Sequence, residues 1–249
     1  MGPIRGVLAW QSVLDALVQA GTAPDGSGSL DVLDLGGGTG SDAVRVAALG
    51  HRVVVVDPSP DALAASARRA AEAGVEVEGR LGDSADLAEH VAPASVDVVI
   101  CHGVLEHIDD PGQAVAAARE VLRPGGWLSV IVPGRVAAVA ARAASGDFAG
   151  ATALVEAAPD ASWDLAGLGP RRWFAEELED LLADHGLTPV LSQGVRALSD
   201  DVPGVVVDGS AGAREELFAL ERSIRRIPQF AGRSAGLQTM ARLESNSHP

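Results

Sequence analysis

The sequence contains no lysine and no tyrosine, and all 19 of its basic residues are arginine. Lysine forms the Schiff bases and many of the phosphate contacts of enzymes. Arginine does not replace it there, because arginine stays protonated and is a poor nucleophile. The composition therefore excludes Schiff-base enzymes, nucleotide sites built on a Walker A lysine, and dehydrogenases that use a Tyr–Lys pair.

Only one cysteine, Cys101, is present, so neither a disulfide framework nor a cysteine-rich zinc site can form. We expect Cys101 to be a small core residue rather than a nucleophile. No apolar run approaches the eighteen or so residues of a membrane span, and the first residues lack the apolar segment of a signal peptide. A cytoplasmic protein with no membrane partner is therefore expected, and its oligomeric state stays open.

The net charge of −15 opposes non-specific binding to the phosphate backbone of a nucleic acid. Any such contact would need a local cluster of arginines. The basic residues near the C-terminus are expected to form a solvated helix face with Glu221 rather than an RNA contact. They are Arg222, Arg225 and Arg226.

Apolar runs and helical patterns alternate along most of the chain. Strands are predicted over residues 30–35, 51–59, 75–83, 95–103, 123–134, 187–198 and 235–243. Helices are predicted over residues 4–20, 41–49, 61–73, 111–122, 173–185 and 211–226. This alternation indicates an α/β fold with a doubly wound, mostly parallel seven-stranded sheet.

We expect one domain over residues 1–249. Residues 1–29 would form an N-terminal helix and lid, 30–134 the cofactor-binding core, and 171–249 the C-terminal part of the sheet. Residues 135–170, which are rich in alanine and glycine, interrupt the alternation and predict a small, mobile helical cap. Ligands of such a sheet bind at the carboxyl ends of its strands.

Four glycines lie within DLGGGTG, residues 34–40, between a predicted strand and a predicted helix. A turn of this kind presents bare backbone and free helix N–H groups to a ligand. The dinucleotide fingerprint G-x-G-x-x-G does not fit, because Ser41 stands at its third glycine. The acidic residue and the glycines instead alternate with other residues, at Asp34, Gly36, Gly38 and Gly40. This spacing resembles the glycine motif of the S-adenosylmethionine-dependent methyltransferases with a Rossmann-like fold.

Further segments follow in the order of that family. Asp57 ends the second strand, where a carboxylate can accept both ribose hydroxyl groups. Asp83 and Ser84 would lie at the adenine edge, although an N-cap pair is an alternative for them. The resemblance implies S-adenosyl-L-methionine as cofactor, with S-adenosyl-L-homocysteine as its product. The cofactor-binding residues that it implies are Asp34, Gly36, Gly37, Gly38, Gly40, Asp57, Pro58, Asp83, Ser84, His102 and Gly103.

A closer resemblance extends over most of the chain. The segments that carry it are IRGVLAWQSVL (4–14), SGDFAG (145–150), GVRAL (194–198) and ALERSIRRIPQF (219–230). They are similar to segments of the bacterial tRNA carboxymethoxyuridine methyltransferases, which esterify a carboxylate on a modified wobble uridine. On this resemblance Arg5 would bind the methionine carboxylate of the cofactor, and tRNA would be the acceptor.

A carboxylate acceptor is already ionised at pH 7 and needs no general base, so no catalytic residue is identified. Methyl transfer then requires mainly that the nucleophile and the methyl group be brought together. We expect Arg135, Arg196 and His107 to contact the acceptor, because arginine makes bidentate contacts with carboxylates. An amine or phenol would need a base, for which His107 or His102 would be the first candidates.

Three functions stay open at this point. The chain could methylate a tRNA carboxylate by in-line transfer, methylate the oxygen or nitrogen of a small molecule, or bind S-adenosylmethionine without catalysis. The acceptor would be tRNA or an anionic small molecule. No metal is expected, because His102 and His107 are five residues apart and lack a helical zinc spacing.

Overall fold

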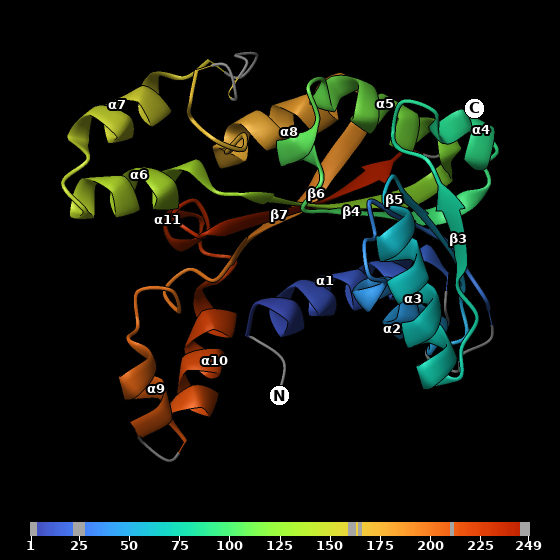
Figure 1. Ribbon diagram of the computed structural model, residues 1–249, viewed down its shortest axis with the longest axis horizontal. Helices are drawn as coiled ribbons and strands as arrows, with labels where there is room; N and C mark the ends of the chain where they lie inside the picture. The colour runs from blue at the N-terminus through green and yellow to red at the C-terminus, as the bar shows by residue number, and fades with distance from the viewer. Residues whose placement is uncertain (1–3, 22–27, 159–162, 164–165, 210–211, 245–249) are drawn as a thin grey trace.

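Seven strands form one sheet in the order β3-β2-β1-β4-β5-β7-β6 (Figure 1). The computed structural model describes residues 4–21, 28–158, 163, 166–209 and 212–244. The strands are β1 (Asp31–Leu35), β2 (Arg52–Asp57), β3 (Glu78–Leu81), β4 (Val96–His102), β5 (Leu122–Pro133), β6 (Leu187–Val195) and β7 (Gly236–Leu243). The first five run parallel, and β7 pairs antiparallel with β5 and β6. The predicted mostly parallel, seven-stranded sheet is confirmed.

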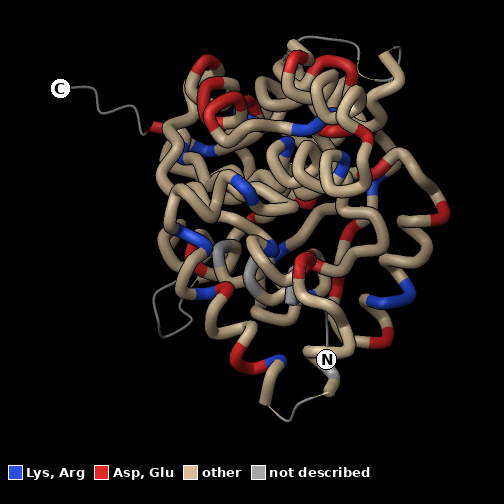
Figure 2. Tube along the Cα trace, turned by 90° about the vertical axis from the view of Figure 1, so that its left-hand side faces the viewer, with Lys and Arg blue, Asp and Glu red and all other residues tan. Residues whose placement is uncertain are grey.

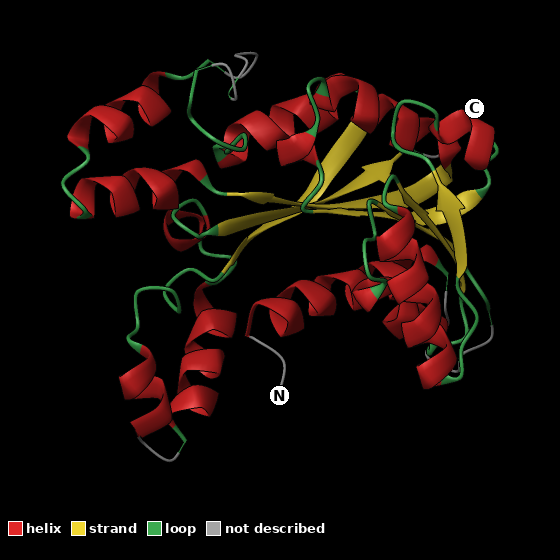
Figure 3. Cartoon of the chain, in the orientation of Figure 1, coloured by secondary structure: helices red, strands yellow, loops and turns green. Residues whose placement is uncertain are grey.

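Helices cover both faces of the sheet (Figure 3). The longer ones are α1 (Ile4–Ala20), α2 (Ser41–Ala47), α3 (Pro60–Ala73), α5 (Pro111–Val121), α6 (Arg135–Ala144), α7 (Phe148–Glu156), α8 (Ala175–Asp184) and α10 (Ala213–Ile224). The shorter ones are α4 (Leu87–His90), η1 (Leu105–His107), α9 (Gly204–Gly209) and α11 (Pro228–Ala231). Among the described helices, none has the length and apolar character that a membrane crossing requires. The cytoplasmic location stays a prediction.

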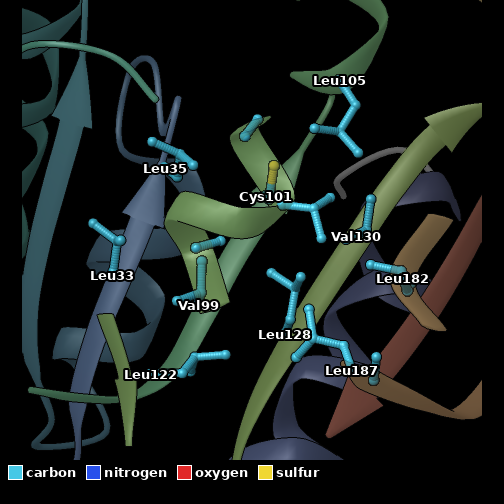
Figure 4. Close-up of a cluster of buried hydrophobic side chains, with 14 of the residues drawn as sticks. Leu33, Leu35, Val99, Cys101, Leu105, Leu122, Leu128, Val130, Leu182 and Leu187 are labelled. Atoms are coloured by element: carbon cyan, nitrogen blue, oxygen red, sulfur yellow. The ribbon is translucent and has the colours of Figure 1, made fainter. Parts of the chain in front are cut away.

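Side chains of β4 alternate between two hydrophobic cores, as the period of a strand requires. Val99 and Cys101 pack into the core beneath α5 and α8 (Figure 4), whereas Val98 and Ile100 pack into the core beneath α1 and α2. Cys101 is 3% exposed, and burial together with the charges of Glu106 and Asp34 raises the pKa of its thiol to about 12. The thiol is therefore protonated and inert.

Two pairs of helices extend from the same end of the sheet (Figure 1). One pair, α6 with α7, is called here the α6–α7 arm and falls within the predicted cap. The other pair, α9 with α10, is called the α9–α10 arm. Its first helix is short and was not expected from the sequence. The mobility of the cap and the division into four parts stay predictions.

The guanidinium of Arg135 joins the α6–α7 arm to the rest of the chain. This side chain is 1% exposed. It donates to the carbonyl of Ala157 at 2.9 Å and to the carbonyl of Arg172 at 3.1 and 3.0 Å, and it pairs with Glu177 at 2.8 Å. The expectation that Arg135 contacts the acceptor is wrong, because these protein acceptors use all three of its nitrogens.

Replacing Arg135 with alanine should lower the free energy of unfolding by about 3–5 kcal/mol, because Glu177 would keep a mostly buried charge without its partner. Urea denaturation measures this change. Arg142→Ala in the same helix is the matched control. It removes an exposed pair with Asp147 (3.2 Å) and should cost less than about 1 kcal/mol. Equal effects of the two substitutions would contradict the anchoring role of Arg135.

Candidate active site

The glycine turn connects β1 to α2 and is tied to β2 by the carboxylate of Asp57. One oxygen of Asp57 accepts the N–H of Gly38 at 2.8 Å, and the other accepts the N–H of Ser59 at 2.9 Å. Gly36, Gly38 and Gly40 have φ angles of 65°, 54° and 74°, a region that favours glycine. The motif therefore adopts a left-handed path that other residues would strain.

Most of the glycines in this turn are needed because the chain packs against itself. An added Cβ would come within 2.6 Å of a neighbouring side chain at three of them. These pairs are Gly36 with Val104, Gly37 with Asp34, and Gly40 with Ser66. At Gly38 the nearest atom would be 4.0 Å away, so Gly38 is the glycine whose bare face is open to a ligand.

Asp34 lies beneath the turn and is 4% exposed. Burial, followed by the charges of Asp42 and Asp57, raises the pKa of its carboxyl to about 8, while a hydrogen bond from the N–H of Ala43 opposes this shift. At pH 7 the Asp34 carboxyl is therefore protonated, and so neutral, in most molecules. It supports the turn from below rather than presenting a charge to a ligand.

The predicted nucleotide contacts lie at the carboxyl ends of β2 and β3. Pro58 is exposed directly after Asp57, and Ser84 is half-buried. One oxygen of the exposed Asp83 accepts the N–H of Ala85 at 2.6 Å, which closes a tight turn. The N-cap alternative does not describe this pair, because α4 begins only at Leu87. Their contact with adenine stays a prediction. So does the role of Arg5, whose side chain lies outside the described residues.

His102, at the end of β4, is held on both sides of its ring. Its Nδ1 lies 3.3 Å from the carboxylate of Asp42, and its Nε2 lies 2.7 Å from the hydroxyl of Ser129. The amide of Gln238 donates to that same hydroxyl at 3.1 Å, so the Ser129 proton can point to Nε2 and leave the N–H on Nδ1. Because both ring nitrogens have protein partners, His102 is not available as the general base.

A cavity of about 1110 Å³ lies between the α6–α7 arm and the carboxyl ends of β4, β5 and β6. Gly103 and His107 line it after β4, and Arg196 lines it after β6. The structure thus brings three of the predicted residues around one space. The glycine turn does not line this space, but Gly103 directly precedes Val104, whose side chain crowds Gly36 of the turn. The wall also holds Arg172, which sequence reasoning missed. Nothing in the local sequence PRRW distinguishes it from its neighbour Arg171.

Arg196 has a φ of 63°, and a buried carboxylate stabilises this unusual conformation. Glu221 of α10 is 0% exposed and accepts the N–H groups of residues 197–199 at 2.9, 2.9 and 2.7 Å. The guanidinium of Arg196 donates to Asp200 at 3.0 Å. Its Nε is buried and has no hydrogen-bond partner in the part of the chain that the structure describes.

The predicted solvated face of α10 is therefore correct only in part. Arg222 and Arg226 are exposed, but Glu221 and Arg225 are 0% and 7% exposed. Glu221 is buried because its carboxylate binds the turn after β6, a partner that lies more than twenty residues away along the chain. Among the described residues, no group of His, Cys, Asp and Glu side chains is placed to hold a metal ion.

The comparison with known protein families identifies the central part of the chain. Residues 33–130 match the family model described as a methyltransferase domain. These residues are a methyltransferase domain. They contain the glycine turn, Asp57, His102 and most of the parallel strands. The class of S-adenosylmethionine-dependent methyltransferases, expected from the glycine motif, is confirmed for this domain.

Curated relatives of the methyltransferase domain act on different acceptors. The tRNA 5-carboxymethoxyuridine methyltransferase of Escherichia coli (strain K12) is 36% identical over 133 residues, which cover 52% of this chain and 48% of the relative. A ubiquinone biosynthesis O-methyltransferase of Xanthomonas axonopodis pv. citri (strain 306) is 34% identical over 145 residues, which cover 58% and 59%. The chain thus spans about half the length of the curated relatives that it matches.

The fold around the methyltransferase domain also has solved counterparts. An S-adenosylmethionine-dependent methyltransferase from Mesorhizobium loti superposes with a TM-score of 0.62 at 17% identity, over 96% of this chain and all of that one. At this level of identity the similarity shows a shared fold. The superposition covers nearly the whole chain, well beyond residues 33–130.

The raised pKa of Asp34 makes stability depend on pH. Its protonated carboxyl contributes stability that is fully present below the unfolded pKa of 3.8 and is lost as the pH rises toward about 8. Between pH 5 and pH 8, the free energy of unfolding should therefore fall less in Asp34→Asn than in the unmodified protein. The difference is at most about 1.4 kcal/mol per pH unit.

Urea denaturation at several pH values measures this difference. Asp180→Asn, which removes an exposed carboxyl on α8, is the control and should follow the unmodified protein. Parallel pH profiles for Asp34→Asn and the unmodified protein would show that Asp34 is ionised in the native state.

Proposed function

We propose that the chain is an S-adenosylmethionine-dependent methyltransferase that methylates a carboxylate of an anionic acceptor. The observation that carries the proposal is the cavity between Gly103 and Arg196, which four arginines line together with Glu106, Asp200 and Asp201. Asp147, Asp200 and Asp201 pair with three of these arginines, so the preference for an anionic ligand rests on the donors that Arg172 and Arg196 keep free.

The glycine turn and Asp57 fit the proposed cofactor. Gly38 leaves its backbone open, and each oxygen of Asp57 uses one lone pair for a backbone N–H and keeps another for a ribose hydroxyl. When bound, the cofactor supplies a methyl group on a positively charged sulfur, which activates it for displacement. Gly103 and the turn would place this methyl group at the mouth of the cavity.

Arg196 would hold the acceptor carboxylate. Glu221 fixes its backbone, and the Arg196 side chain, which is 30% exposed, keeps guanidinium N–H groups for a carboxylate besides the one that binds Asp200. Because the carboxylate is ionised at pH 7, the residues around it need only to position it and exclude water. This agrees with the engaged ring of His102 and with the inert thiol of Cys101. His107 and the alanine-rich side of α6 would complete the wall.

We propose a carboxymethoxyuridine of tRNA as the acceptor. The relative from E. coli carries that activity in its name, and the cavity is as large as the upper range of small-molecule pockets. Acidic residues are prominent along the helices at the top of Figure 2, and arginines are scattered over the middle of that view. Because the net charge of −15 opposes contact with a phosphate backbone elsewhere, RNA contact would be confined to the neighbourhood of the cavity. The ubiquinone-type relative supports a small-molecule acceptor as the second candidate.

The cofactor site is tested by Asp57→Ala. The substitution should weaken binding of S-adenosylhomocysteine about tenfold or more, because one or two charge-assisted hydrogen bonds are lost. Isothermal titration calorimetry measures the dissociation constant. Asp61→Ala, which removes an exposed carboxyl on the adjacent helix, is the control. An unchanged constant in Asp57→Ala would remove Asp57 from the ribose site.

The acceptor is tested with purified protein, S-adenosylmethionine and tRNA that carries carboxymethoxyuridine. Mass spectrometry of the digested nucleosides should show the methyl ester, which mild alkali removes. Arg196→Ala should raise the acceptor KM about ten- to hundredfold, since a charge-assisted pair is lost, and leave cofactor binding unchanged. Arg69→Ala, on the exposed side of α3, is the control. Methylation of a small phenol or amine, with no ester on tRNA, would favour the second candidate instead.

A further inference from the structure

Four arginines line the cavity, and three of them are paired with carboxylates. The pairs are Arg142 with Asp147 at 3.2 Å, Arg196 with Asp200 at 3.0 Å, and Arg233 with Asp201 at 3.5 Å. The guanidinium of Arg172 makes neither a hydrogen bond nor an ion pair with any residue in the described part of the chain. Arg172 is thus the one arginine of the cavity wall that no described carboxylate neutralises.

The backbone around Arg172 is fixed on both sides, although its side chain is not. The buried guanidinium of Arg135 donates twice to the carbonyl of Arg172, at 3.1 and 3.0 Å. The N–H of Arg171 donates to Glu106 at 3.3 Å, and the N–H of Trp173 donates to Pro133 at 3.0 Å. Arg172 therefore extends into the cavity from a backbone that η1, the end of β5 and the start of α6 hold in place.

A guanidinium without a protein partner, on a backbone that is held in place, is available to an oxyanion. Its planar fork of N–H groups matches the oxygens of a phosphate or a carboxylate, and no protein ion pair has to be broken to use it. Arg196 differs, because one of its nitrogens already donates to Asp200. The same cavity therefore contains two separate anion contacts.

We propose that Arg172 binds a second oxyanion of the acceptor, separate from the carboxylate that is methylated. The acceptor class is thus a molecule with two anionic groups, such as a carboxylate-bearing nucleotide or a small dicarboxylate. Arg135 is a positioning residue for this contact and does not touch the acceptor. The proposal rests on the proposed carboxyl methylation, whose acceptor it specifies.

Paired acceptors test the second contact. Carboxymethoxyuridine and its 3′-monophosphate have the same reacting group and differ in one oxyanion. With the unmodified protein, the phosphate should lower KM about tenfold or more while kcat changes little, because the added pair acts on binding. In Arg172→Gln the lower KM of the phosphate-bearing acceptor should disappear. In Arg172→Lys part of it should remain, because the lysine ammonium keeps the charge but lacks the planar fork of the guanidinium. Arg242→Gln, at the opposite end of β7, should keep the full advantage.

Direct binding is measured by titrating inorganic phosphate, and separately malonate, into protein loaded with S-adenosylhomocysteine. Both ions should compete for the site in the unmodified protein, and their affinity should fall about tenfold in Arg172→Gln. Tighter binding of phosphate points to a nucleotide, and tighter binding of malonate points to a dicarboxylate. Equal phosphate advantage and equal ion affinity in Arg172→Gln and the unmodified protein would overturn the second site, even if methylation proceeds. Absence of methyl transfer to either acceptor, with ion binding intact, would instead overturn the proposed carboxyl methylation.

Discussion

Backbone groups that emerge from the carboxyl ends of the strands have no sheet partner, and here charged side chains supply one. Asp57 accepts two N–H groups after β1 and β2, and Glu221 accepts three after β6. Arg135, which follows β5, donates to carbonyls of the segment between α7 and α8. A buried charge is costly unless it is hydrogen-bonded, and a buried backbone group has the same need. The buried charges and the buried backbone groups form hydrogen bonds with one another. The loops around the cavity are therefore held without help from a ligand.

This arrangement separates structural charges from those that face the cavity. Arg135 and Glu221 are the most deeply buried of the group, and their bonds go to the chain itself. Arg196 directly precedes the segment that Glu221 holds, and Arg172 lies within the segment that Arg135 holds. A held backbone that leaves cationic side chains incompletely paired at a cavity wall favours binding of an anion, because only these side chains, and not the loops, have to be ordered.

The sheet could be predicted from the sequence because its signal is local. The run from Val96 to His102 indicates a strand buried on both faces, and the glycine turn indicates the strand-to-helix connection after β1.

The sequence does not show why each glycine of the turn is needed. Val104 and Ser66, which crowd Gly36 and Gly40, are distant in sequence, and only the fold shows that Gly38 alone has an open face. The glycine motif therefore identifies the class of protein correctly, although its glycines are needed for different physical reasons: most avoid a clash within the protein, and Gly38 leaves an open face.

The roles of the charged residues could not be predicted, since they depend on partners far along the chain. Arg135 and Arg196 both follow a strand and look alike in sequence, yet the first meets Glu177 and is buried, whereas the second lines the cavity. Glu221 fits the polar side of an amphipathic helix until the turn after β6 packs against it. Short elements such as α9 also lack the periodicity that identifies longer helices.

A crystal structure of the protein with S-adenosylhomocysteine tests most directly whether this sheet edge and cavity form one methyl-transfer site. We expect the ribose at Asp57, the chain of the ligand along Gly38, and the thioether sulfur facing the cavity between Gly103 and Arg196. A ligand whose sulfur is closed off from that cavity by protein atoms, or that binds away from Asp57, would contradict the assignment of the cavity as the acceptor site.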